Sequence, residues 1–220
     1  TPSFEAALTS WVDALPTTCA EPLPAMTMSL AVDAASAQLL FSADAQGDVT
    51  SFASVPVAMD SAVLSYNVPN MDSVLVSYKT LAKILSGEIT NWNDPAIAKE
   101  NPNTELPDLP LTVSLDAESN SLKALATLLE HNKQKLDVSK FNAIPFAEFT
   151  SPELAAGQIV IQPNSMAVLQ GSTTLGFLTG GKNAETGEVN QAFATEESLS
   201  SAGTQLVAKK TGNVIELSLD

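Results

Sequence analysis

Residues 83–102 read KILSGEITNWNDPAIAKENP, and this stretch contains the end of one helix and the whole of the next. The helix expected over Lys79–Leu85 ends with Gly87 in the C′ position, because glycine readily adopts the left-handed backbone that closes many helices. Asp94-Pro95 then predicts an N-cap followed by proline at the first helical position. Asn101-Pro102 ends this second helix, because proline cannot continue it.

Helices and strands alternate along the rest of the chain. Apolar residues at helical spacing after Ser3 predict a helix that Pro16 ends, and a second apolar stripe predicts a helix over 122–136. Ser151-Pro152-Glu153 is expected to open another helix, whereas Gly180-Gly181 is interpreted as a turn. Such alternation indicates an α/β domain with a largely parallel sheet. Strands are expected at 26–32, 38–41, 56–68, 73–77, 111–115, 175–178 and 214–219, with a turn at 186–188.

Charge is the most unusual bulk property of the sequence. The 220 residues carry a formal net charge of −15, and all ten basic residues are lysines, of which Lys79 is the first. This charge repels the phosphate backbones of nucleic acids and anionic membrane surfaces, so neither is expected as a partner. Two interpretations stay open, namely a solvated acidic coat and a surface that attracts cations.

Several function classes lack their sequence signals. No apolar run reaches the roughly 18 residues of a membrane span, and any export sequence is expected to be removed already or to lie outside these residues. Cys19 is the only cysteine, so an internal disulfide and a multi-cysteine metal site are excluded. His131 is the only histidine, and its place near the end of a predicted helix favours an exposed or dipole-stabilised side chain over a catalytic base. The sequence contains no G-x-S-x-G motif, no P-loop and no His/Cys metal spacing. We therefore expect no enzyme, no cofactor and no metal.

Residues 75–113, LVSYKTLAKILSGEITNWNDPAIAKENPNTELPDLPLTV, resemble the phosphate-specific substrate-binding proteins of bacterial ABC transporters, the PstS family. VPVAMDSAVLSYNVP at 55–69 and STTLGFLTG at 172–180 resemble further segments of that family. The resemblance implies the type II periplasmic-binding fold, in which two α/β lobes hold a ligand between them. It implies a reduced first lobe over 1–72 and 181–220 and a second lobe over 73–180, with Trp92 as a packed anchor.

The phosphate site of the resembled family is largely replaced in this sequence. The family places an arginine and then a Ser-Asp-Gly-Ser-Gly-Thr loop at the start of a helix, where these groups bind the anion. Asp116 stands at the position of that arginine, and no arginine elsewhere can replace it. The other positions carry Glu118 for the acid, Ser119 and Ser121 for the glycines, Asn120 for the ligand serine, and Leu122 for the threonine.

One ligand residue of the family has a counterpart in the first lobe. Phe41–Ala45, FSADA, resembles the segment whose aspartate accepts a proton from phosphate, which makes Asp44 a candidate, although a solvated turn residue is an equal alternative. The cleft candidates are therefore Asp44, Asp116, Ser119, Asn120 and Ser121. Asp33 and Glu118 could join the acidic ones in holding Ca²⁺ or an amine-bearing solute. Any bound anion is expected at Ser119 and Ser121, near Lys123.

Two functions follow from the resemblance. The first is an extracytoplasmic solute-binding protein or domain that serves an ABC permease, with phosphate doubtful as the solute. The alternative is a ligand-free PstS-like fold that acts as a structural or interaction module at the cell surface. The first lobe is expected to be reduced, or to be completed by sequence outside these 220 residues.

Overall fold

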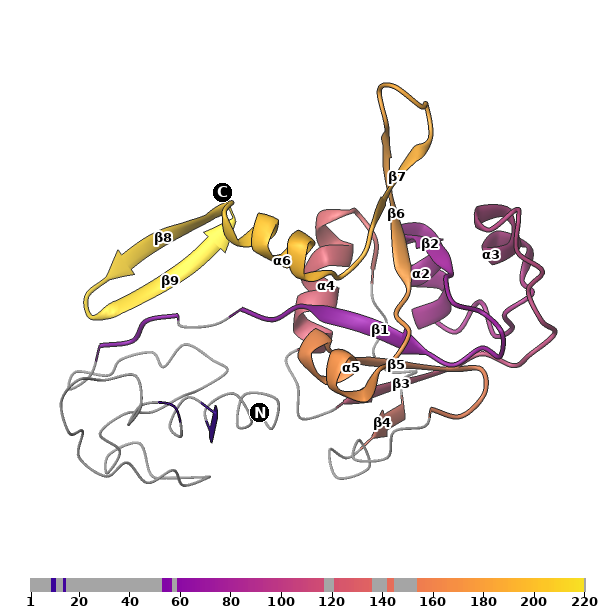
Figure 1. Cartoon of the computed structure of the whole chain (residues 1–220), viewed down its shortest axis with the longest axis horizontal. Coiled ribbons are helices and arrows are strands. Elements are labelled where there is room, and N and C mark those ends of the chain that lie inside the picture. The colour runs from indigo at the N-terminus through magenta and orange to yellow at the C-terminus, as the bar shows by residue number, and fades with distance from the viewer. Residues whose placement is uncertain are drawn as a thin grey trace. The chain divides into compact units, whose positions relative to one another are not determined.

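The computed structural model describes residues 9–10, 14, 53–56, 59–116, 121–135, 142–144 and 154–219 (Figure 1). The chain divides into two compact units, of which the larger consists of Val57–Val207 and Leu219–Asp220. The smaller unit consists of Thr1–Pro56 and Ala208–Ser218. Thr9, Ser10 and Ala14 are helical, in agreement with the predicted N-terminal helix. The predicted strands at 26–32 and 38–41 lie outside the described residues.

The larger unit contains a mixed four-stranded sheet in the order β1-β5-β3-β4. β3 lies between β5 and β4 and is parallel to both, whereas β1 is antiparallel to β5. Both α4 and α5 contact β1 and β5. The strands are β1 (Ala62–Tyr66), β3 (Thr112–Asp116), β4 (Asn142–Ile144) and β5 (Gln158–Pro163), and the two helices are α4 (Ser121–His131) and α5 (Asn164–Gln170).

A second sheet has the order β2-β6-β7, formed by β2 (Leu75–Ser77), β6 (Gly176–Lys182) and β7 (Val189–Ala192). β2 is parallel to β6, and β6 is antiparallel to β7 with a register shift between Leu178 and Lys182. The predicted turn at Gly180-Gly181 is wrong, because both residues lie within β6. A glycine with positive φ fits such an irregularity of pairing, and Gly180 has a φ of 79°.

Local capping signals place two short helices beside the second sheet, as the sequence predicts. α2 (Tyr78–Leu85) is followed by Gly87 with a φ of 71°. The Gly87 N–H donates to the Ile84 carbonyl at 3.0 Å and the Glu88 N–H to the Lys83 carbonyl at 2.9 Å, which is the Schellman pattern. α3 (Pro95–Glu100) begins where the Asp94 side chain accepts from the Ala96 N–H. The predicted C′ glycine and N-cap aspartate are both confirmed.

Asn101, which ends α3, also fastens that helix to β2. Its side-chain oxygen accepts from the Leu75 N–H at 2.9 Å, and its Nδ2 donates to the Leu75 carbonyl at 2.8 Å. The same Nδ2 donates to the carbonyl of Ile97 at 2.9 Å. Because the side chain imitates a paired strand, it satisfies both backbone groups of Leu75.

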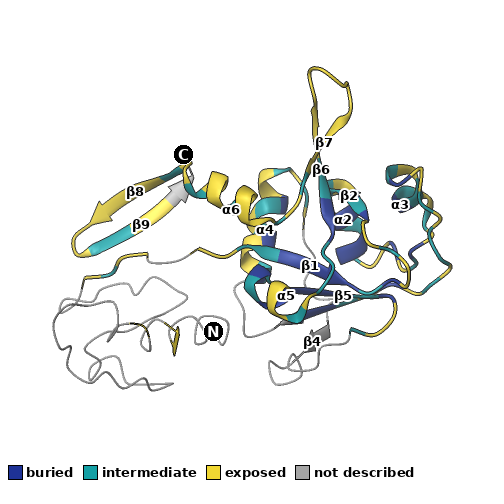
Figure 2. Ribbon diagram, in the orientation of Figure 1, coloured by how far each residue is buried: buried dark blue, intermediate teal, exposed yellow. Residues whose placement is uncertain are grey.

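The main core gathers around Trp92, whose side chain is fully buried. Its Nε1 donates to the Gly157 carbonyl at 3.0 Å, and its ring centroid lies 5.5 Å from that of Tyr66. Trp92 is thus a packed anchor, as expected. Figure 2 shows the buried residues concentrated in β1, β5 and α2. Around it lie Tyr66 and the fully buried side chains of Leu64, Leu81, Ile84, Leu85, Ile97, Leu125, Leu129, Ile159 and Ile161.

Strand β5 is the main error of secondary-structure prediction. A helix was expected to open at Ser151-Pro152-Glu153, which lies outside the described residues, but residues 158–163 form a strand. The four central residues of β5 are all buried and three of them are apolar, so the strand shows no alternation of buried and exposed positions. Periodicity does not separate such a strand from a buried helix. α5 follows β5 at once and was also not predicted.

The N-terminus of α5 is capped from a distant part of the chain. Pro163 stands at the N-cap and supplies no side-chain hydrogen bond. Instead, the Asp60 carboxylate accepts from the Ser165 N–H at 3.2 Å and from the Ser165 hydroxyl. A carboxylate at this place satisfies a free N–H group and interacts favourably with the helix dipole.

Two further elements complete the described chain. α6 covers Glu196–Gly203, and its N-cap Thr195 forms a capping box with Ser198. β8 (Leu206–Thr211) and β9 (Val214–Leu219) form a hairpin, and β9 coincides with the predicted strand at 214–219. Among the described residues, we find no helix with both the length and the apolar character needed to cross a membrane.

Candidate functional site

The predicted site lies where β3 leads into α4. Asp116 is the last residue of β3 and pairs with Ile144 of β4, and α4 begins at Ser121. In open α/β sheets, ligands bind beyond the carboxyl ends of parallel strands, where helix N-termini offer free N–H groups. The strand–loop–helix order required for such a site is therefore present. Ser119 and Asn120 stand between these two elements in the sequence, outside the described residues.

The first turns of α4 show how the site differs from a phosphate cradle. Ser121 is buried, with 5% of its surface exposed. Leu122 is half-buried and packs against the main core, although its position corresponds to a ligand threonine in the resembled family. Lys123 is exposed. The start of α4 thus directs an apolar side chain inward at a position where an anion site would need a hydroxyl.

The acidic candidates cannot be placed together from the described residues. Asp33, Asp44 and Glu118 lie outside them, and of Asp116 only the backbone position is described. Within the described part of the chain, no three His, Cys, Asp or Glu side chains are arranged to hold a metal ion. The predicted convergence of Asp33, Asp44, Asp116 and Glu118 on a cleft therefore stays a prediction.

Ser114, two residues before Asp116, belongs to a polar pair that sequence reasoning missed. Its hydroxyl accepts from the Gln158 side-chain amide at 3.0 Å, and Gln158 in turn accepts from the Ala155 N–H at 3.0 Å. These bonds connect β3 to the loop before β5. The sequence signal was a glutamine at the start of a β-branched apolar run, which suits a strand better than a helix.

A second polar group is buried between β1 and β5. Gln162 is fully buried, and its Nε2 donates to the Ser65 hydroxyl at 2.7 Å and to the Gln170 side chain at 3.1 Å. Its oxygen Oε1 finds no partner among the described residues, and neither does the buried hydroxyl of Ser61. The sequence signal for this buried group is a polar residue within each of the two apolar strand segments, Ser65 in β1 and Gln162 in β5.

Two tyrosines have perturbed acidity. Burial and, to a smaller extent, the negative charge of Asp72 raise the pKa of Tyr66 to about 12. The Tyr66 hydroxyl donates to the Met71 carbonyl at 3.3 Å. Burial also raises the pKa of Tyr78, whose ring stacks on Phe177 with centroids 5.8 Å apart. Both phenols stay protonated at neutral pH, so neither serves as a base there.

Comparison with known proteins gives a family match over most of the chain. A model of the PBP superfamily domain matches residues 25–213. The phosphate-binding protein PstS2 of Mycobacterium bovis is 36% identical over 59 residues, which cover 27% of this chain and 16% of that protein. The phosphate-binding protein PstS 3 of Mycobacterium leprae is 39% identical over 59 residues, with the same coverage. The matching segments thus span about a sixth of the length of these relatives.

Two solved structures also match part of this chain. PstS from Borrelia burgdorferi has a TM-score of 0.42 and 19% identity, covering 66% of this chain and 53% of that chain. An ABC-type phosphate transport receptor from Vibrio cholerae has a TM-score of 0.43 and 13% identity, covering 66% of this chain and 52% of that chain.

Proposed function

This chain belongs to the PBP superfamily, and from that membership we propose that it is an extracytoplasmic, PstS-like solute-binding protein or domain whose phosphate ligands have been replaced. The membership confirms the predicted family resemblance and the periplasmic-binding-protein-like α/β fold. The reduced first lobe and the lobe boundaries at residues 72–73 and 180–181 stay predictions. We propose that this chain likewise binds a ligand and does not act as a catalyst.

The observation that carries the proposal is the packing of Leu122 against the core at the start of α4. A leucine there removes a hydroxyl from the corner where the PstS-like site would hold its anion. The replacement of the family arginine by Asp116 acts in the same direction, because a carboxylate repels an anion in a cleft where water screens poorly.

The expected loss of phosphate affinity is large. A hydrogen bond to a charged group contributes about 1.5 to 3 kcal/mol, so three missing contacts imply a deficit of roughly 4 to 9 kcal/mol. The three are the two N–H bonds of the arginine fork and the bond of the threonine hydroxyl in the resembled family. Since a factor of ten in Kd corresponds to about 1.4 kcal/mol, phosphate affinity should fall by at least about a thousandfold.

If the site no longer binds phosphate, the chain binds either a different solute or a protein partner. In the first reading, the cleft takes a small solute other than phosphate and delivers it to an ABC permease outside the cytoplasm. In the second, the fold has lost its ligand and acts as a structural or interaction module at the cell surface. Breadth of family similarity supports the first reading, and the replaced ligands support the second.

Calorimetry tests the proposal directly. Titration of the unmodified protein with phosphate should give weak binding or none, and a micromolar or tighter Kd would overturn the loss of the site. A thermal-shift screen with sulfate, Ca²⁺ and small solutes separates the two readings, since a ligand at a hundred times its Kd adds about 2.7 kcal/mol of stability. If a solute stabilises the protein and substitution of Asp116 abolishes that stabilisation, the cleft is functional and the first interpretation is favoured.

A further inference from the structure

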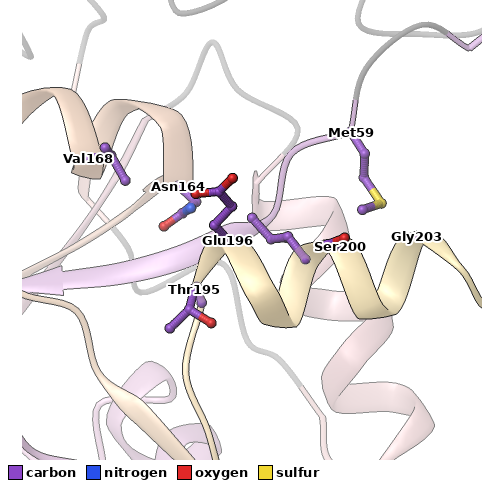
Figure 3. Close-up of a pocket in the computed structure, with 9 residues that line it drawn as sticks. Met59, Asn164, Val168, Thr195, Glu196, Ser200 and Gly203 are labelled. Atoms are coloured by element: carbon purple, nitrogen blue, oxygen red, sulfur yellow. The ribbon is translucent and has the colours of Figure 1, made fainter.

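A groove of about 660 Å³ lies within the larger unit, between α5, α6 and the segment before β1 (Figure 3). Its volume falls in the range of small-molecule sites, which is roughly 300 to 1,000 Å³. Among the described residues that line it, none belongs to β3 or α4. The groove is therefore a different place from the β3–α4 corner, and inferences about it go beyond the proposed function.

The walls of the groove combine three apolar side chains. Met59 is 44% exposed and Val168 is 70% exposed, while Leu199 is half-buried. Single exposed apolar residues are ordinary on protein surfaces. Here, however, all three line one concavity together with a few polar groups, and that composition is typical of ligand sites.

Asn164 places an unused amide in the same groove. Only 8% of this residue is exposed, and its backbone N–H donates to the Ser61 carbonyl at 2.8 Å. Its side chain, in contrast, forms no hydrogen bond with any residue of the described chain. Its amide atoms are not among the fully buried atoms that lack a partner in the described chain, so an occupant of the groove can reach them. The Asn164 amide thus offers both a donor and an acceptor to an occupant.

Glu196 gives the groove its charge. It is the only ionisable residue among the described residues of the lining, and its carboxylate has neither a hydrogen bond nor an ion pair there. The capping box of Thr195 fixes the start of α6, so the position of Glu196 is well defined. Figure 3 draws Asn164 and Glu196 between Val168 and Met59. A carboxylate in a protein of net charge −15 attracts cations and excludes anions.

We propose that this groove is a second binding site and that it takes a small amphipathic cation, an alkyl or aralkyl ammonium. The ammonium group pairs with the Glu196 carboxylate and donates a hydrogen bond to the Asn164 side-chain oxygen. The hydrocarbon body lies against Met59, Val168 and Leu199. A plain anion lacks the complementary charge, and a small inorganic cation lacks the apolar body.

A matched series of probes tests this assignment on the unmodified protein. Hexylammonium, hexanol and hexanoate share a six-carbon hydrocarbon chain and differ in charge. Their titration therefore separates the contribution of charge to binding from the contribution of apolar contact. With methyl-labelled methionine, we expect hexylammonium to shift the Met59 methyl signal saturably, together with the Asn164 side-chain amide. Hexanol should bind more weakly and hexanoate most weakly. Equal responses to hexanoate and hexylammonium, or shifts that spare both reporters, overturn the proposal.

Neighbouring residues supply the control variants. Glu196→Gln should weaken hexylammonium binding about two- to fivefold, the range expected for an exposed ion pair. Glu197→Gln changes the same charge in the same helical turn but does not line the groove, so its Kd should stay unchanged. Equal effects of the two variants would mean that only the general charge of α6 matters, which contradicts a site at Glu196.

A second pair tests the apolar wall. Val168 and Leu169 are 70% and 72% exposed, but only Val168 lines the groove. Val168→Ser should weaken hexylammonium binding about threefold through lost apolar contact, whereas Leu169→Ser should leave it unchanged. Loss of binding only in Leu169→Ser, or in neither variant, contradicts the proposed position of the hydrocarbon chain.

Discussion

The indole of Trp92 donates a hydrogen bond to the carbonyl oxygen of Gly157 at 3.0 Å, across 65 positions of sequence. Both groups are buried, and the same carbonyl accepts from the Thr112 N–H at 3.2 Å. The loop between α2 and α3 is thereby fixed to the loop before β5. This bond explains why a tryptophan follows the helix stop at Gly87.

Gly157→Ala should destabilise the protein strongly. Gly157 has a φ of 83°, and a Cβ atom there would lie 2.1 Å from the Pro110 carbonyl oxygen. Left-handed strain and overpacking together predict a loss of about 2 to 5 kcal/mol in the free energy of unfolding, which urea denaturation would measure. Gly187→Ala is the control, because its φ is 73° but no atom lies within 4 Å of the added Cβ. Equal losses in the two variants would contradict the proposed clash.

Asn101→Ala should loosen α3 from β2. The substitution leaves the Leu75 N–H and carbonyl without their side-chain partner, and an unsatisfied buried group costs about 1 to 3 kcal/mol. We expect a loss in the free energy of unfolding of roughly 2 to 4 kcal/mol. Asp94→Ala, which removes only the cap of the same helix, should cost about 0.5 to 2 kcal/mol. The prediction fails if Asp94→Ala is the more damaging variant.

Stability should fall at alkaline pH because of Tyr66. Its pKa is raised from about 10 in the unfolded chain to about 12 in the fold. Between these values the unfolded state releases a proton that the folded state retains, so the free energy of unfolding decreases as pH rises from about 10 to 12. Below about pH 10 this contribution is fully present. Tyr66→Phe should flatten the decline, as measured by denaturation at several pH values; an unchanged slope would contradict it.

Asp116→Arg should restore part of a phosphate site. The substitution replaces a repulsive carboxylate by the guanidinium that stands at this position in the resembled family. We expect phosphate affinity to rise at least tenfold in calorimetric titration, with Leu122 and the absent loop glycines limiting the gain. Glu105→Arg is the control for net charge, since Glu105 is exposed and distant in sequence from the β3–α4 connection. If Glu105→Arg raises the affinity equally, the site lies elsewhere.

The elements that the sequence predicted correctly are those with local signals. Gly87 and Asp94 act within one turn of their own helices, so their roles follow from residue type and spacing. β5 was missed because burial of both faces removes the alternation that identifies a strand. Where a buried strand begins and ends depends on the strands and helices that pack against it. These lie far away in the sequence, so a short window does not contain the information.

The candidate site was predicted mainly from the resemblance to the PstS family, and only partly from the chemistry of individual residues. The position of Asp116 at the end of β3 and of Ser121 at the start of α4 agree with the expected strand–loop–helix order. The α5–α6 groove was not predicted at all, because Asn164 and Glu196 belong to different helices and neither carries a motif. Their proximity is a property of tertiary packing.

The capping of α5 by Asp60 has a consequence for the order of folding. α5 has seven residues and no N-cap side chain of its own, so in isolation it is too short to be stable. Its cap arrives only when the segment before β1 reaches it, which closes a loop of about a hundred residues. α5 should therefore gain protection from amide hydrogen exchange late, after β1 has paired with β5, and it should be among the first helices to open.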